Sequence, residues 1–143
     1  MKLYILTAGK PKSSFLTEGM REYEKRINRF AQVKILHTQE DNPSIEKVRK
    51  LCKQSKLILL DEKGKEMSSL QFADFLEKAR NHSEDLCFFI GGPDGHSETM
   101  KREADILFSL SPLTFPHDLA TLVLLETLYR SLSILANHPY HRA

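Results

Sequence analysis

The chain has 143 residues, of which 41% are hydrophobic, and its formal net charge at pH 7 is +2. This length and apolar content fit one domain with a buried core, residues 1–143. No apolar run approaches the roughly 20 residues that cross a bilayer, and Met1 to Ala8 lacks the cleavage site of a signal peptide. We therefore expect a cytoplasmic protein with no membrane segment.

Short apolar runs alternate along the chain with segments of helical periodicity. In chain order the prediction is strand Lys2 to Ala8, helix Phe15 to Phe30, strand Gln32 to His37, helix Ile45 to Ser55, strand Lys56 to Asp61, helix Leu70 to Arg80, strand Asp85 to Ile90, helix Glu98 to Ala104, strand Ile106 to Leu110 and helix Asp118 to Ala136. Every helix but the last follows a serine, whose hydroxyl can accept a hydrogen bond from a first-turn amide. The alternation predicts an α/β fold with a mostly parallel sheet flanked by helices, and ligand sites at the carboxyl ends of the strands.

The last predicted helix, Asp118 to Ala136, is apolar on more than one face. One face can pack on the sheet, whereas the other needs a second partner. A twofold-related copy of the chain is the simplest such partner, so we expect a homodimer.

Neither cysteine lies in a metal-binding or disulfide pattern, so Cys52 and Cys87 are expected to be buried free thiols. The modest net charge hides two basic clusters. They are Arg21, Lys25, Arg26 and Arg29, and then Lys47, Arg49, Lys50, Lys53 and Lys56. Each cluster fits either a phosphate-binding surface or an ordinary solvated helix face.

Two irregular loops follow the last two predicted strands. Gly91 to His96 contains three glycines, which allow a close backbone approach to a ligand, although an ordinary Gly-Pro turn has the same composition. Its spacing matches neither a dinucleotide-binding loop nor a Walker loop. Ser109 to His117 alternates apolar and small hydroxyl residues, a composition suited to holding a flat aromatic ring but also typical of a hydrophobic turn.

The carboxyl-terminal tail, His138 to Arg142, contains imidazoles, a phenol and a guanidinium. Tails are commonly disordered, but these groups can stack on a base or bind phosphate. On the preceding helix, Glu126 and Arg130 stand four residues apart, a spacing that also indicates a simple ion pair.

Together these segments resemble the bacterial ribosomal RNA large subunit methyltransferase H family, SPOUT enzymes that methylate N3 of a pseudouridine in 23S ribosomal RNA. The resemblance covers essentially the whole chain, and its specificity lies in the order of the segments. They are KLYILTAGK (2–10), LLDEKGK (59–65), IGGPDGH (90–96), SLSPLTFPH (109–117), LLETLYRSLSI (124–134) and NHPYHR (137–142). The chain departs from many relatives in being shorter around Asp41 to Ser44, and in having His96 where the family often has an apolar residue.

The resemblance implies a SPOUT fold with a C-terminal trefoil knot, S-adenosyl-L-methionine as cofactor, a homodimer, and 23S ribosomal RNA within the assembled ribosome as partner. The cofactor residues that it implies are Leu60, Gly92, Leu110, Ser111, Pro112, Leu113, Thr114 and Phe115. No metal is needed, because the methyl group of a sulfonium is already activated.

The proton on N3 of the pseudouridine must leave before or during attack, so a base or a stabilising environment is required. We expect Tyr140 to stack on or hydrogen-bond the base, His141 to accept the proton and Arg142 to hold phosphate. Further candidates are His138, Glu126 and Arg130.

Two other functions fit the sequence. One is a non-catalytic ribosome-binding factor with a relic cofactor pocket, and the other is a nucleotide-binding α/β protein that acts on small molecules. Cofactor binding separates the first from an enzyme, and methylation of ribosomes separates the second.

Overall fold

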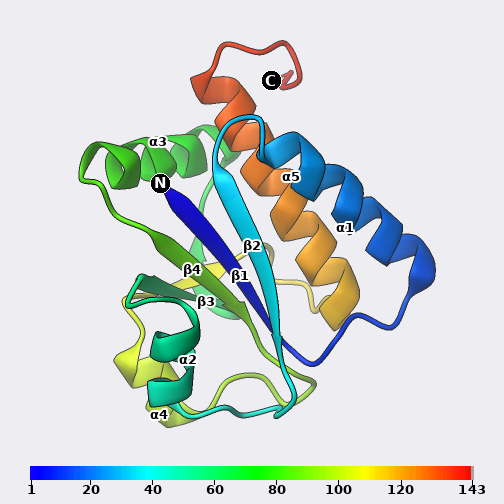
Figure 1. The fold of residues 1–143 in the computed structure, drawn as a ribbon, viewed down its shortest axis with the longest axis vertical. Helices are drawn as coiled ribbons and strands as arrows, with labels where there is room; N and C mark the ends of the chain where they lie inside the picture. The colour runs from blue at the N-terminus through cyan, green and yellow to red at the C-terminus, as the bar shows by residue number, and fades with distance from the viewer. Residues whose placement is uncertain (143) are drawn as a thin grey trace.

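A computed structural model describes residues 1–142 as a five-stranded sheet covered by helices on both faces (Figure 1). The elements are β1 (Lys2–Ala8), α1 (Ser14–Ile27), β2 (Gln32–Thr38), α2 (Ile45–Leu51), β3 (Lys56–Glu66), α3 (Ser69–Asn81), β4 (Leu86–Ile90), α4 (Glu98–Glu103), β5 (Ile106–Ser109) and α5 (His117–Leu135). The strand order is β2-β1-β4-β3-β5, and all four pairings are parallel. The predicted α/β fold and parallel sheet are confirmed.

The predicted serine caps are present at the starts of α1, α2, α3 and α4. The hydroxyls of Ser13, Ser44, Ser68 and Ser97 accept hydrogen bonds from the amides of Leu16, Lys47, Gln71 and Met100. At α3 the side chain of Gln71 also accepts from the Ser68 amide, which completes a capping box. Each cap is worth about 1 kcal/mol, so the starts of these helices depend on local chemistry as well as on packing.

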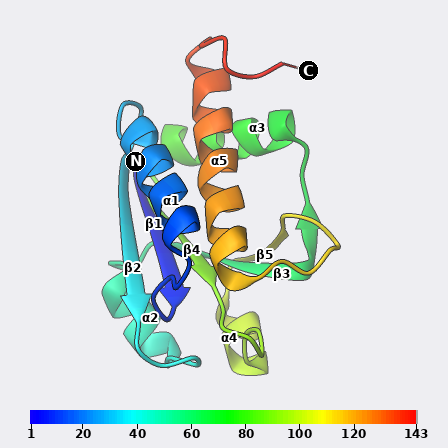
Figure 2. The same ribbon diagram turned by 90° about the vertical axis from the view of Figure 1, so that its right-hand side faces the viewer.

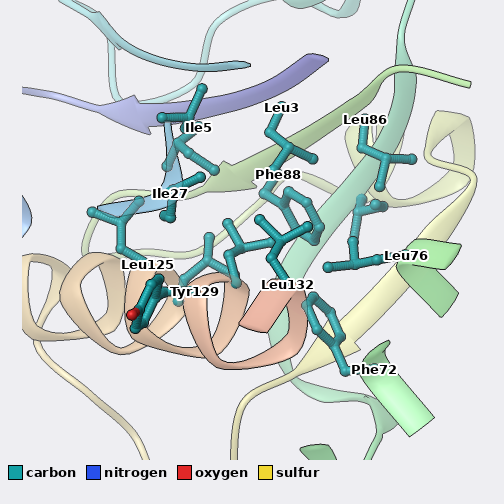
Figure 3. Close-up of a cluster of buried hydrophobic side chains, with 14 of the residues drawn as sticks. Leu3, Ile5, Ile27, Phe72, Leu76, Leu86, Phe88, Leu125, Tyr129 and Leu132 are labelled. Carbon is teal, nitrogen blue, oxygen red and sulfur yellow. The ribbon is translucent and has the colours of Figure 1, made fainter. Parts of the chain in front are cut away.

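The larger core lies between the sheet and α1, α3 and α5 (Figure 3). Phe88 from β4 and Leu125 from α5 are fully buried in it, and Phe72 from α3 stacks on Phe108 with ring centroids 5.0 Å apart. A smaller core lies on the opposite face, where α2 and α4 pack on the sheet. Cys52 and Cys87 are buried free thiols in this smaller core, as predicted.

The structure corrects several predicted boundaries. β3 continues from Asp61 to Glu66 because it pairs with β5 again after a register shift between Leu60 and Lys65. This polar extension has no apolar pattern that would reveal it. α2 ends at Leu51 rather than Ser55, because Lys53 and Gln54 have φ angles of 52° and 61°, outside the helical region.

Two further predictions about the helices were wrong. α1 ends at Ile27 and not at Phe30. α5 ends at Leu135 and not at Ala136. Within residues 1–142, no helix combines the length and apolar character of a membrane span.

At Gly64, the backbone of β3 passes very close to the backbone of β5. A Cβ built at Gly64 would lie 2.6 Å from the carbonyl carbon of Leu107. Gly64→Ala should therefore lower the free energy of unfolding by about 3 kcal/mol, because backbone atoms must move. Urea denaturation measures the change.

Gly19→Ala is the matched control, because a Cβ at Gly19 would meet only the flexible side chain of Leu122, at 3.1 Å. The gain in helix propensity, up to about 1 kcal/mol, should leave this variant near wild-type stability. Equal stability of the two variants would contradict the close backbone approach at Gly64.

Candidate functional site

A cavity of about 860 Å³ opens at the carboxyl edge of the sheet, between the segments that follow β3, β4 and β5. Ligand pockets usually have about 300–1,000 Å³. The cavity is lined by every predicted cofactor residue except Pro112, namely Leu60, Gly92, Leu110, Ser111, Leu113, Thr114 and Phe115. Segments more than 50 residues apart in sequence thus meet at one place.

The glycine loop turns tightly over this cavity. The Gly95 amide donates to the Gly92 carbonyl at 2.9 Å, and Gly95 has a φ of +72°, which favours glycine. A Cβ at Gly91 would lie 3.1 Å from the ring of His96. A Cβ at Gly92 would lie 3.3 Å from a carboxylate oxygen of Asp41, in the loop after β2. Sequence reasoning missed the Asp41 contact, since no local pattern links these two loops.

His96 fixes the glycine loop to the end of β4. Its Nε2 lies 3.1 Å from the Phe89 carbonyl oxygen, and its ring packs edge-on against the Phe89 ring with centroids 4.7 Å apart. Burial lowers the pKa of His96, and this effect outweighs the hydrogen bond to Phe89, which acts in the opposite direction. The neutral ring therefore donates its Nε2 hydrogen to the carbonyl.

Two carboxylates after Leu60 connect the β3 segment to the other walls of the cavity. Asp61 accepts from the Lys63 amide at 2.9 Å and lies 3.3 Å from the Lys101 ammonium. Burial raises the pKa of Asp61, but the Lys63 amide and the Lys101 ammonium lower it by more. The carboxyl is therefore ionised. Glu62 accepts from the Thr114 hydroxyl at 2.6 Å, which joins the β3 and β5 loops. Sequence reasoning missed both carboxylates, although their place directly after an apolar strand marks them as strand-end residues.

The β5 loop is shaped by its own hydroxyl groups. Ser109 is buried and donates to the Ser111 carbonyl at 2.9 Å, while the Leu113 amide donates to the Ser111 hydroxyl at 3.0 Å. Leu113 is 71% exposed and stands at the cavity wall. An exposed large apolar side chain beside a cavity is suited to covering a bound ligand.

The first turn of α5 forms another wall of the cavity. His117 lines the cavity, and its Nδ1 lies 3.1 Å from Oδ1 of Asp118. The other oxygen of Asp118 accepts from the amides of Lys12 and Ser13 at 2.7 and 2.8 Å. Burial raises the pKa of Asp118, but the Ser13 amide and His117 lower it on balance. Within residues 1–142, the buried Nε2 of His117 has no hydrogen-bond partner.

The tail lies at the opposite end of α5 from the cavity (Figure 2). The Tyr140 hydroxyl lies 3.0 Å from the Tyr23 hydroxyl, and its ring packs edge-on against Tyr129 with centroids 4.6 Å apart. Burial, followed by the hydrogen bond to Tyr23, raises the pKa of Tyr140. This phenol is therefore protonated at neutral pH in the arrangement observed.

Arg130 organises the rest of the tail. Its guanidinium binds Glu126 at 2.7 Å, lies 4.9 Å from the Tyr140 ring centroid, and donates to Nδ1 of His141 at 3.1 Å. The predicted ion pair of Glu126 and Arg130 is thus present. Because α5 has 19 residues, it separates the cavity from the tail by about 28 Å. One chain does not bring Tyr140, His141 and Arg142 to its own predicted cofactor residues.

The lowered pKa of His96 predicts a pH-dependent stability. In the unfolded chain His96 takes up a proton near pH 6.5, whereas the folded chain resists protonation to a lower pH. The unfolded state therefore binds more protons in that interval, so stability is complete above about pH 6.5 and is lost as the pH falls towards the folded pKa. His96→Gln should flatten this decline in thermal midpoint, measured between about pH 7.5 and 5.

The pKa of His37 is also lowered, mainly by burial. His37 should therefore still cause a smaller decline in the thermal midpoint of His96→Gln as the pH falls. The control is His82→Gln, because His82 is exposed. Its thermal midpoint should decline with falling pH as much as that of the wild type. An unchanged decline in His96→Gln would contradict this role of His96.

No group of three or more His, Cys, Asp or Glu side chains in residues 1–142 is arranged to hold a metal ion. Residues 1–141 match the protein family described as "Predicted SPOUT methyltransferase". A SpoU methyltransferase from Streptomyces viridochromogenes, solved in complex with AdoMet, has a similar fold with a TM-score of 0.53 at 10% identity, covering 96% of this chain and 58% of the other.

Two curated relatives are similar over essentially their full length. A ribosomal RNA large subunit methyltransferase H from Deinococcus radiodurans is 43% identical, with 99% of each chain covered. The protein of the same name from Coprothermobacter proteolyticus is 40% identical, with 99% of this chain and 100% of the relative covered. The chain therefore belongs to the SPOUT methyltransferase family, among the ribosomal RNA large subunit methyltransferases H.

Proposed function

We propose that this protein transfers the methyl group of S-adenosyl-L-methionine to N3 of a pseudouridine in 23S ribosomal RNA, on the assembled ribosome in the cytoplasm. The observation that carries the proposal is the convergence of the expected cofactor residues on one cavity at the carboxyl edge of a parallel sheet. The names of the relatives support ribosomal RNA of the large subunit as the substrate.

The chemistry of the cavity fits this cofactor. Leu60, Leu110, Leu113 and Phe115 offer apolar surface to an adenine ring, and the glycine loop offers backbone groups without side chains in the way. When bound, S-adenosyl-L-methionine would supply an activated methyl group on its sulfonium. The work left to these residues is to bind it, orient it and exclude water.

We further propose that the second copy in a homodimer supplies the tail. A separation of about 28 Å prevents a tail from serving the cavity of its own chain without rearrangement. Leu119, Val123 and Ile134 are only partly buried on the outer face of α5, beside the pair of Glu126 and Arg130. An antiparallel twofold packing of this face would bring each tail towards the other chain's cavity.

The tail can assist removal of the N3 proton in two ways. An arginine side chain only donates hydrogen bonds, so Nδ1 of His141 accepts from Arg130 and cannot take a proton until that contact breaks. Release of the contact would free both groups, His141 to accept the proton and Arg130 to stabilise the negative charge on the base. Tyr140 would then stack on the nucleotide, and Arg142 would bind phosphate.

The trefoil knot expected from the resemblance is also part of the proposal. It is supported by the match of residues 1–141 to the SPOUT methyltransferase family. The knot would hold the β3, β4 and β5 loops at fixed positions around the cofactor. An experimental backbone trace tests this path.

Methyl transfer to ribosomes tests the proposed function directly. Ribosomes from cells that lack the protein, incubated with it and S-adenosyl-L-methionine, should gain one methyl group on a pseudouridine, detected by mass spectrometry of nuclease digests. Cofactor binding without methylation would instead indicate a ribosome-binding factor with a relic pocket or an enzyme acting on small molecules.

The same assay tests the shared site by mixing two inactive variants. His141→Ala combined with Arg142→Ala disables the tail and retains Tyr140, which packs against the core. Gly92→Val combined with Asp41→Ala weakens the cavity's affinity for the cofactor, so the assay is run at a cofactor concentration well below the Kd of this variant. After subunit exchange about half of the dimers are mixed, and each has one complete site, so activity should recover to about a quarter of wild type. No recovery would mean that each chain uses its own tail.

The placement of the cofactor is tested at Gly92. Gly92→Val should weaken binding of S-adenosyl-L-methionine tenfold or more, about 1.4 kcal/mol, measured by calorimetry. The new side chain also meets Asp41, so a loss of binding alone is ambiguous. Adding Asp41→Ala removes that clash: binding should stay weak if the valine occupies cofactor space, and restored binding would show that displacement of the Asp41 loop caused the loss.

A further inference from the structure

The two basic clusters of the sequence differ in how many of their charges are already neutralised. In the α2 cluster, Lys47 binds Glu40 at 2.6 Å, Arg49 lies 3.6 Å from Glu103, and Lys56 lies 3.9 Å from Glu84. Only Lys50 and Lys53 of this cluster lack an ion pair within residues 1–142. This cluster also lies on the face of the sheet opposite to α5.

The α1 cluster keeps its charge exposed. Arg26 pairs with Glu22 at 2.7 Å, but Arg21, Lys25 and Arg29 are exposed and form no ion pair within the described part of the chain. A spacing of four residues places Arg21 and Lys25 on one side of α1, and Arg29 follows in the turn directly after the helix. We call these three cations the basic ridge. The same segment contains three carboxylates, Glu18, Glu22 and Glu24, so its four cations leave it a net charge of +1.

The basic ridge of Arg21, Lys25 and Arg29 faces away from the core. The buried residues of α1, Met20 and Ile27, lie on the opposite side of the helix. In a single copy of the chain, the ridge is therefore exposed and can bind a partner molecule. It also differs from the outer face of α5, which the proposed dimer would cover.

The C-terminal end of the ridge lies next to the tail. Tyr23 of α1 holds the Tyr140 hydroxyl at 3.0 Å, and Phe30, which follows Arg29, packs edge-on against His138 with centroids 6.4 Å apart. A partner strand whose nucleotide is held by the tail would therefore pass next to the ridge. Exposed cations along such a path match the regularly repeated negative charges of a phosphate backbone.

We propose that Arg21, Lys25 and Arg29 bind the phosphate backbone of ribosomal RNA next to the target nucleotide, and that the α2 cluster does not. This inference rests on the proposed function for the identity of the RNA. The contacts would determine affinity and register without reading base sequence. They also explain how a chain with a net charge of only +2 can bind RNA, because its unpaired charge is concentrated near the tail.

The test removes three charges from each cluster in turn. The ridge variant combines Arg21→Gln, Lys25→Gln and Arg29→Gln, and the control combines Lys47→Gln, Lys50→Gln and Lys53→Gln. Binding to unmethylated ribosomes is measured as a function of salt concentration. The ridge variant should bind about tenfold or more weakly at low salt, and its slope of log affinity against log salt should be shallower by about 2 to 3.

The ridge variant should keep the wild-type thermal midpoint and cofactor affinity. The α2 control should match wild type in all measurements. An unchanged salt slope in the ridge variant, or an equal loss in the control, would overturn the inference. If wild-type protein binds ribosomes but does not methylate them, the proposed function fails while the binding comparison still tests the ridge.

Crosslinking identifies what the ridge touches. Because Cys52 and Cys87 are 1% and 0% exposed, Lys25→Cys introduces a single accessible thiol for a photoreactive maleimide. On ribosomes the label should crosslink to ribosomal RNA. Crosslinks only to a ribosomal protein, or to a second copy of this chain, would assign the ridge to that partner and reject the phosphate contact.

Discussion

The parallel pairing of β4 with both β1 and β3 is the constraint on which the rest of the structure depends. All five residues of β4 are buried, and the strand pairs in register with Leu3 to Thr7 on one side and with Lys56 to Leu60 on the other. A strand buried in this way needs helices on both faces of the sheet, and parallel neighbours need long crossover connections. The same order places the segments after β3, β4 and β5 at one edge, where the cavity forms.

Polar interactions rather than apolar packing hold the loops of the cavity in position. His96 binds the end of β4, Glu62 binds Thr114 across two loops, and Asp118 joins the segment before α1 to the first turn of α5. The hydrogen bonds of Glu62 and Asp118 are charge-assisted, and such bonds are shorter and stronger than neutral ones. They give the loops defined shapes while leaving apolar side chains, such as Leu113, free to contact a ligand.

The sequence was sufficient to predict the order of the elements, because apolar runs, helical periodicity and serine caps are local signals. It also indicated the glycine loop and the β5 loop as candidate ligand-binding segments, and the structure brings both loops to one cavity. The extension of β3 to Glu66 was not predictable, because it comes from pairing with β5 rather than from the polar residues themselves. The contact of Asp41 with Gly92 and the separation of the tail from the cavity likewise depend on tertiary arrangement.

α5 carries part of the cavity wall at one end, through His117, and the tail at the other. In the proposed two-chain site, the length of this helix would set the distance between the cofactor cavity and the tail. A single inserted residue would move the tail by about 1.5 Å along the axis and rotate it by about 100°. The proposed site would therefore constrain the number of residues in α5 more strictly than the choice of its exposed side chains.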